Sequence, residues 1–223
     1  MAARPRRTEP CNALRLACWN ADGARGRKLE LEHFLSQQSF DICLLSETFL
    51  NPGQAFRLDN YVCHRTDRPT TGGGTTILVC RCLVQYSVPV PGLTHLEATA
   101  IQVTMAGKPV LILVAYISPF RSLIGADLTA CFGGGLPVLV AEDLNAKNVD
   151  WNSRLNTRQG ENRTCLCRRE LLSDLWTGLP DHQQIQPLIY SRCSGHRHNQ
   201  EYLIPSLSDF LLNTNLGPPP GSN

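Results

Sequence analysis

The sequence predicts an α/β domain, and three observations carry this prediction. The 223 residues are 42% hydrophobic and 18% charged, a composition that excludes a disordered or collagen-like protein. Short apolar runs of strand length recur along the chain, and segments with helical periodicity lie between them. No apolar run reaches the ~18–20 residues that cross a bilayer. We therefore expect one globular domain with strands and helices interposed.

The strands are predicted from buried apolar runs, and the helices from spacing. Leu31, Phe34 and Leu35 recur at helical intervals, which predicts an amphipathic helix over residues 27–38. A second helix is expected around residues 165–176. The predicted strands cover residues 14–20, 41–46, 76–83, 98–104, 110–117, 137–142 and 208–212. We expect a basic tail at 1–12, the folded domain at 13–215 and a Pro/Gly-rich tail at 216–223.

Charge and cysteine usage point to a location rather than to a function. The net charge of +2 neither demands nor excludes a nucleic-acid partner. The N-terminus lacks the apolar stretch of a secretory signal, and several of the ten cysteines sit inside apolar runs. We therefore expect reduced core thiols in an intracellular protein, with the nucleus as one candidate compartment and no membrane association. The cluster around Cys165 and Cys193 contains no Cys-x-x-Cys pair, so structural zinc is not expected.

Polar residues stand at the ends of several predicted strands. These residues are Asn20, Glu47, Tyr116, Asp143 and Asn145, and a further carboxylate, Asp209, lies inside the last predicted strand. In sheet proteins, ligand sites commonly gather beyond one set of strand ends, so the pattern predicts that these side chains converge on one cleft. Carboxylate and amide oxygens are hard ligands suited to Mg²⁺ or Mn²⁺. The alternative is that each residue closes its own local turn.

These residues lie within motifs that resemble a known family. The motifs are Trp19-Asn20-Ala21-Asp22-Gly23, Ser46-Glu47-Thr48, Gly72-Gly73-Gly74, Ala115-Tyr116, Asp143-Leu144-Asn145-Ala146-Lys147 and Ser208-Asp209-Phe210. Their order resembles that of the endonuclease/exonuclease/phosphatase superfamily, and in particular the apurinic-type endonuclease domain of non-LTR (LINE-type) retrotransposons of the jockey and R1 lineages. The resemblance spans about residues 14–213.

The resemblance implies both a fold and a set of roles. The fold is a four-layer α/β sandwich in which two facing mixed β-sheets are flanked by helices, as the many strands and few long helices also favour. Glu47 and Asp22 resemble metal-site residues for Mg²⁺ or Mn²⁺. The remaining residues resemble the catalytic set, namely Asn20, Tyr116, Asp143, Asn145 and Asp209, with Asp143 and Asn145 at the water and phosphate and Asp209 beside a histidine.

Two departures from the family's motifs lower the activity that we expect. The family's Ser-Asp-His after Asp209 does not occur in this sequence, and the family's Gly before Asp143 is Glu142. We therefore expect a Mg²⁺-dependent DNA endonuclease domain that is weak or inactive, because a lost general base typically costs ~10²–10⁴-fold in rate. The alternative is a non-catalytic nucleic-acid binder or an inert relic of a mobile element. The candidate DNA contacts are Lys147, Arg154 and Arg158, although a solvated loop or helix face is the favoured explanation for most of the basic residues in this segment.

Overall fold

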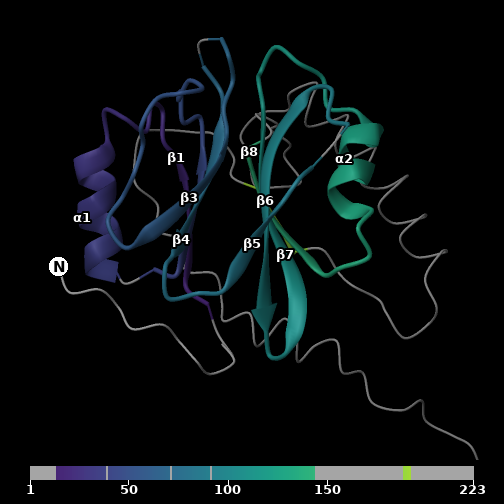
Figure 1. Ribbon diagram of the computed structural model, residues 1–223. Coiled ribbons are helices and arrows are strands. Elements are labelled where there is room, and N and C mark those ends of the chain that lie inside the picture. Colours follow the sequence, from purple (N-terminus) through teal and green to yellow (C-terminus); the bar gives the residue numbers. More distant parts are fainter. Residues whose placement is uncertain (1–13, 39, 71, 91, 144–187, 192–223) are drawn as a thin grey trace, which may run out of the picture.

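The structure, a computed structural model, describes residues 14–38, 40–70, 72–90, 92–143 and 188–191. These residues form two β-sheets that face each other (Figure 1). The first sheet has four strands in the order β1-β2-β4-β3, and the second has five in the order β5-β6-β7-β8-β9. Both sheets contain parallel and antiparallel pairs, so both are mixed.

The first sheet brings the N-terminal strands together. Its strands are β1 (Leu16–Asn20), β2 (Ile42–Ser46), β3 (Tyr61–Thr66) and β4 (Thr75–Cys80). β1 and β2 are parallel, and Asn20 pairs with Ser46 at their carboxyl ends. β4 is antiparallel to β2, so Thr75 at its start pairs with Ser46. The end of β1, the end of β2 and the start of β4 therefore lie side by side.

The second sheet is built around a long hairpin. Its strands are β5 (Gln85–Val88), β6 (Leu96–Met105), β7 (Lys108–Ile117), β8 (Val138–Asp143) and β9 (Leu188–Ser191). Near the carboxyl end of β7, Tyr116 pairs with Glu97 of β6 on one side and with Asp143 of β8 on the other. β7, β8 and β9 are parallel to one another.

Alternation along the strands produces three apolar layers. One face of each sheet contributes to a core between the sheets, which includes Leu16, Leu44, Ile77, Ile101 and Ile112. The opposite face of the first sheet packs residues such as Leu45 and Leu78 in one cluster with Leu31 and Leu35 of α1 (Lys28–Gln38). The opposite face of the second sheet does the same with Leu128 and Cys131 of α2 (Gly125–Phe132). Figure 1 shows one helix outside each sheet.

The structure confirms the predicted four-layer sandwich of two facing mixed sheets flanked by helices. The helix predicted at 27–38 and six of the seven predicted strands are present with shifts at their ends, the largest in β4, which ends at Cys80 rather than at residue 83. Leu83 instead donates its amide to the carbonyl of Cys80 in a turn. β3, β5, β9 and α2 were not predicted. The helix expected around 165–176, the strand expected at 208–212 and both expected tails lie outside the described residues.

Most of the described cysteines match the expected chemistry. Cys43 and Cys131 are buried free thiols, and Cys18 and Cys63 are partly buried free thiols. The expectation is wrong for Cys80 and Cys82, whose sulfur atoms are joined as a disulfide, since a turn brings their Cα atoms to 5.2 Å. None of the helices in the described part of the chain is long and apolar enough to cross a membrane.

Candidate active site at one end of the sandwich

The polar strand ends of both sheets lie at the same end of the sandwich. Parity along each strand assigns their faces: Asn20 and Ser46 continue the rows that contain Leu16 and Leu44, which face the other sheet. Tyr116 continues the row of Val110, Ile112 and Val114 in the second sheet, which also faces inward. The candidate site therefore caps the core between the sheets.

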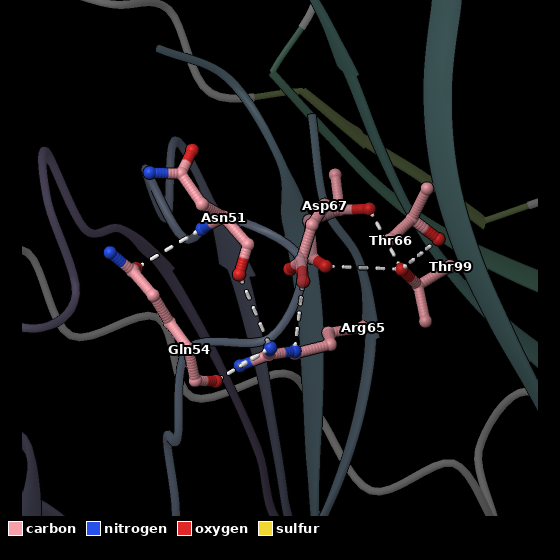
Figure 2. Close-up of polar contacts among 7 residues, drawn as sticks. Asn51, Gln54, Arg65, Thr66, Asp67 and Thr99 are labelled. Atoms are coloured by element: carbon pink, nitrogen blue, oxygen red, sulfur yellow. Dashed lines mark hydrogen bonds and ion pairs between the residues drawn. The ribbon is translucent and has the colours of Figure 1, made fainter. Parts of the chain in front are cut away.

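Contacts between the sheets show that the two sets of strand ends meet. Thr99 of β6 donates its hydroxyl to Oγ1 of Thr66 in β3 over 2.9 Å (Figure 2), and its Oγ1 lies 2.8 Å from Oγ1 of Thr75 in β4. The amide of Gly74 donates to Oε2 of Glu97 over 2.6 Å. These contacts join β6 to β3, to β4 and to the turn before β4, and they fix the separation of the two sheets beside the polar strand ends.

Glu47 follows β2 directly and is held by backbone hydrogen bonds. Its carbonyl accepts from the amide of Gly23 at 3.0 Å, and the carbonyl of Thr48 accepts from Ala24 at 2.9 Å. On the other side, Thr48 and Phe49 donate their amides to the carbonyls of Gly74 and Gly73, at 3.2 and 2.9 Å. The backbone that carries the Glu47 carboxylate is therefore fixed between the loop after β1 and the glycine turn before β4.

The same end of the sandwich holds unusual backbone conformations. Of the five non-glycine residues with positive φ in the described part of the chain, three lie here, namely Asp22 (42°), Glu47 (51°) and Phe49 (52°). Each such residue typically costs about 1–3 kcal/mol and persists only where its surroundings hold it. Such residues cluster at functional sites, so the strain favours a functional role for this end.

Two glycines permit the close approach of the sheets. A Cβ on Gly73 would lie 2.7 Å from Oε2 of Glu97, and a Cβ on Gly74 would lie 2.7 Å from Oγ1 of Thr48. Both residues also have positive φ, at 71° and 84°. Glycine is therefore required here by both conformation and space. The GGG motif noted in the sequence therefore lies where the turn before β4 meets both Glu97 of the second sheet and Thr48 after β2.

Asn20 and Asp22 occupy the loop after β1. The side-chain oxygen of Asn20 accepts the amide of Asp22 at 3.1 Å, so Asn20 does form a local turn. The carboxylate of Asp22 is exposed and lies 3.5 Å from Arg27 in an ion pair. Among the described residues, no group of three or more His, Cys, Asp or Glu side chains is placed to hold a metal ion.

Asp143 ends β8, and its backbone pairs with Tyr116; Glu142 pairs with Ala115 on one side and with Ser191 on the other. Tyr116 itself is buried. The other predicted site residues, which are Asn145, Lys147, Arg154, Arg158 and Asp209, lie outside the described residues. The roles expected of all these residues remain predictions.

The loop after Glu47 is hydrogen-bonded to the edge strand β3 (Figure 2). Arg65 donates to the carbonyl of Gln54 at 2.7 Å and to that of Asn51 at 3.5 Å. The same guanidinium forms an ion pair with Asp67 at 3.0 Å. Arg65 therefore orders the segment that leads away from the candidate site.

Sequence reasoning missed Glu97, the carboxylate nearest to the glycine turn. The prediction began this strand at Ala98, whereas β6 begins at Leu96 and places Glu97 on the inward face beside Tyr116. The available signal was the alternation from Leu96 to Ala100, in which Glu97 and Thr99 share one face. Arg68, which forms an ion pair with Glu97, was also missed.

Comparison with known proteins identifies the class to which this fold and site belong. The sequence pattern of the Endonuclease/Exonuclease/phosphatase family matches residues 17–209. The chain therefore belongs to this family.

The relatives confirm the resemblance to non-LTR retrotransposons. The chain is 26% identical over 220 residues to the RNA-directed DNA polymerase from mobile element jockey of Drosophila melanogaster, which covers 94% of this chain and 22% of that protein. It is 25% identical over 157 residues to the probable RNA-directed DNA polymerase from transposon BS of the same species, covering 67% and 17%. The chain thus spans about a fifth of the length of the jockey relative.

A solved structure shows the same fold. The endonuclease domain of TRAS1, a telomere-specific non-LTR retrotransposon, superposes with a TM-score of 0.58 and 15% sequence identity, covering 70% of this chain and 71% of that one. At this identity the likeness concerns the fold. It agrees with the two-sheet sandwich described above.

Proposed function

We propose that this chain is a Mg²⁺-dependent endonuclease domain that nicks a DNA strand by hydrolysing a phosphodiester bond. The observation that carries the proposal is the position of Glu47, on a backbone fixed from both sides at the end where the polar strand ends of the two sheets meet. Membership of a family of endonucleases, exonucleases and phosphatases supports the reaction class. The relation to mobile-element polymerases supports DNA as the substrate.

The residues at this end fit a magnesium ion. Mg²⁺ is usually bound through one or two carboxylates and completes its octahedral shell with water and substrate phosphate. Glu47 is half-buried and projects from a strained, immobilised backbone, which suits a fixed ligand. Glu47 would hold the ion, with Asp22 or Asp143 as a second carboxylate once Asp22 leaves Arg27. A bound ion would supply charge stabilisation at the phosphate and lower the pKa of a coordinated water.

The other residues act on the scissile phosphate. In this proposal Asn20 supports the phosphate and the loop that carries Asp22, and Tyr116 donates its hydroxyl to the charge that develops on phosphate oxygen. Asp143 and Asn145 orient the attacking water, and Asp209 orients an imidazole where one is present. The DNA backbone on either side would be met by Lys147, Arg154 and Arg158.

The rate at which these 223 residues nick DNA should be low. These 223 residues contain no Ser-Asp-His after Asp209, so on their own they supply no imidazole in the family's position. Water must then lose its proton without a positioned base, which costs about 3–6 kcal/mol in the barrier. We therefore propose slow nicking rather than efficient turnover.

A supercoiled plasmid assay tests the proposal. The chain should convert supercoiled DNA to the nicked circle slowly with Mg²⁺ and not with EDTA. Glu47→Gln should abolish nicking, because the ion loses its main anionic ligand. Glu32→Gln is the matched control, since Glu32 lies on the surface of α1 in an ion pair with Lys28 at 3.4 Å. Nicking that survives Glu47→Gln would refute the assignment.

The second candidate is a non-catalytic nucleic-acid binder. It would bind the plasmid in a gel-shift assay with the same affinity before and after Glu47→Gln. It would also leave the DNA intact at every Mg²⁺ concentration. That combination would replace the endonuclease proposal.

A further inference from the structure

We propose that Glu97 is a positioning residue that holds the Glu47 backbone in place through the glycine turn. The proposal rests on the proposed function only where it concerns metal binding at Glu47. Neither the family resemblance nor the strand-end pattern pointed to Glu97.

Glu97 is hydrogen-bonded to the glycine turn through Gly74. The amide of Gly74 donates to Oε2 of Glu97 at 2.6 Å, and the other carboxylate oxygen pairs with the guanidinium of Arg68. The side chains of Glu97 and Arg68 are only 17% and 24% exposed, so solvent screens this arrangement less than it would a surface ion pair. A charge-assisted hydrogen bond of this kind is roughly twice as strong as a neutral one.

The glycine turn is hydrogen-bonded to the two residues that follow Glu47. The carbonyls of Gly73 and Gly74 accept the amides of Phe49 and Thr48, the two residues that follow Glu47. Gly73 leaves no room for a Cβ beside Glu97, and Gly74 leaves none beside Thr48. A shift of the Glu97 carboxylate is therefore transmitted to the backbone of residues 47–49 through direct contacts.

The backbone at Glu47 and Phe49 is strained. Glu47 and Phe49 have positive φ, at 51° and 52°, and such conformations persist only where the surroundings hold them. The loop after β1 supplies one side of that support, through Gly23 and Ala24. Glu97 supplies the other side, because it fixes the turn to which Thr48 and Phe49 are bonded.

The alternative is a purely structural role, in which Glu97 and Arg68 only join the two sheets. Asp41 provides the matched comparison, since it is also a buried carboxylate that accepts a backbone amide, that of Arg15 at 2.9 Å. Asp41 precedes β2 and so lies at the opposite end of the first sheet from Glu47. If Glu97 only stabilised the fold, Glu97→Ala and Asp41→Asn would both affect the candidate site only through a loss of overall stability. The two variants would then act alike on that site.

Amide hydrogen exchange by NMR separates these readings without any need for activity. In Glu97→Ala, the amides of Gly74, Thr48 and Phe49 should exchange at least about tenfold faster, because the glycine turn loses its hydrogen bond to Glu97 and opens locally more often. Glu97→Gln keeps an acceptor and should give an intermediate effect at the same three amides. Asp41→Asn should accelerate Arg15 and leave those three unchanged. Unchanged protection of Gly74, Thr48 and Phe49 in Glu97→Ala would overturn the proposal.

Metal binding supplies the second readout. We expect Mn²⁺ affinity, measured by electron paramagnetic resonance, to fall about tenfold in Glu97→Ala and to stay unchanged in Asp41→Asn, since only the first change releases the Glu47 backbone. Equal losses in the two variants would reduce Glu97 to a structural residue. If the unaltered chain binds no Mn²⁺, the proposed function fails, while the exchange rates still decide whether Glu97 positions residues 47–49.

Discussion

Tyr116 and Asp143 lie opposite each other in the register of β7 and β8, two parallel strands that end at the same point. The pairing places the phenol and the backbone of the aspartate in one row at the carboxyl end of the second sheet. Glu97 occupies the next position in that row, on the other side of Tyr116. Because Glu97 also accepts the amide of Gly74, and the carbonyl of Gly74 accepts the amide of Thr48, the row is connected through the glycine turn to the segment that carries Glu47.

We expect that adding the imidazole found in complete relatives raises the rate of DNA nicking. Extending the chain with a strand and the Ser-Asp-His of a complete relative should accelerate Mg²⁺-dependent nicking about 10²–10⁴-fold, the typical contribution of a positioned base. The matched control is the same extension with Ala in place of the histidine. Robust nicking by the unextended chain, lost in Glu47→Ala, would show that the histidine matters less than we propose.

Asp127 should contribute strongly to stability. Its fully buried carboxylate accepts the amides of Thr94, His95 and Leu96 at 2.8, 2.9 and 2.9 Å. Asp127→Asn replaces one acceptor by a donor, which should lower the free energy of unfolding by about 1.5–3 kcal/mol in urea denaturation. Glu32→Gln should change it by less than about 0.5 kcal/mol, since Glu32 forms only a surface pair. Equal losses in the two variants would contradict the structure.

The partly buried thiol of Cys63 and the buried thiol of Cys131 should react slowly with alkylating reagents. Burial raises the pKa of Cys63 from 9.0 to about 11, with Arg65 opposing the rise, and burial raises the pKa of Cys131 to about 12. Since the thiolate is the nucleophile, the rise at Cys63 lowers its reactive fraction at pH 8 about 100-fold. Alkylation by iodoacetamide, followed by mass spectrometry, should be slow in the native protein and normal in urea. Native rates equal to those in urea would contradict this burial.

His64 should make stability depend on pH. Burial lowers the pKa of His64, and the neighbouring side chain of Gln85 opposes this shift. The folded state therefore favours the neutral ring. Its contribution to stability is complete above the unfolded pKa of ~6.5 and is lost as the pH falls through the lower folded value. Between pH 7.5 and 5, the unaltered protein should lose more unfolding free energy than His64→Gln. Parallel profiles for the two proteins would be the contrary result.

Strands whose side chains are almost all buried could be predicted from the sequence. The apolar runs of β2, β4 and β7 are buried on both faces, and such runs are legible without any tertiary information. β3 and β5 are edge strands with half-exposed side chains, so their polar residues hide the strand pattern. α2 has eight residues and begins at a glycine, which gives a short and weak helical signal.

In the candidate site too, some residues could be predicted from the local sequence and others could not. Asn20, Glu47 and Tyr116 could be proposed because each stands at the end of an apolar strand, a local feature. Glu97 could not be, since its partners Gly74 and Arg68 are 23 and 29 residues away in the sequence. The contact between the sheets depends on register and on space at two glycines. Neither can be predicted from one strand alone.

The most direct test of the account is to locate the metal. Mn²⁺ added to the ¹⁵N-labelled chain should broaden the amide signals of residues 20–23, 46–49, 73–74 and 116–118, because these segments surround the proposed ion, and Glu47→Gln should remove that broadening. Broadening centred at the opposite end of the sheets, around Asp41, or broadening that persists in Glu47→Gln, would contradict the account.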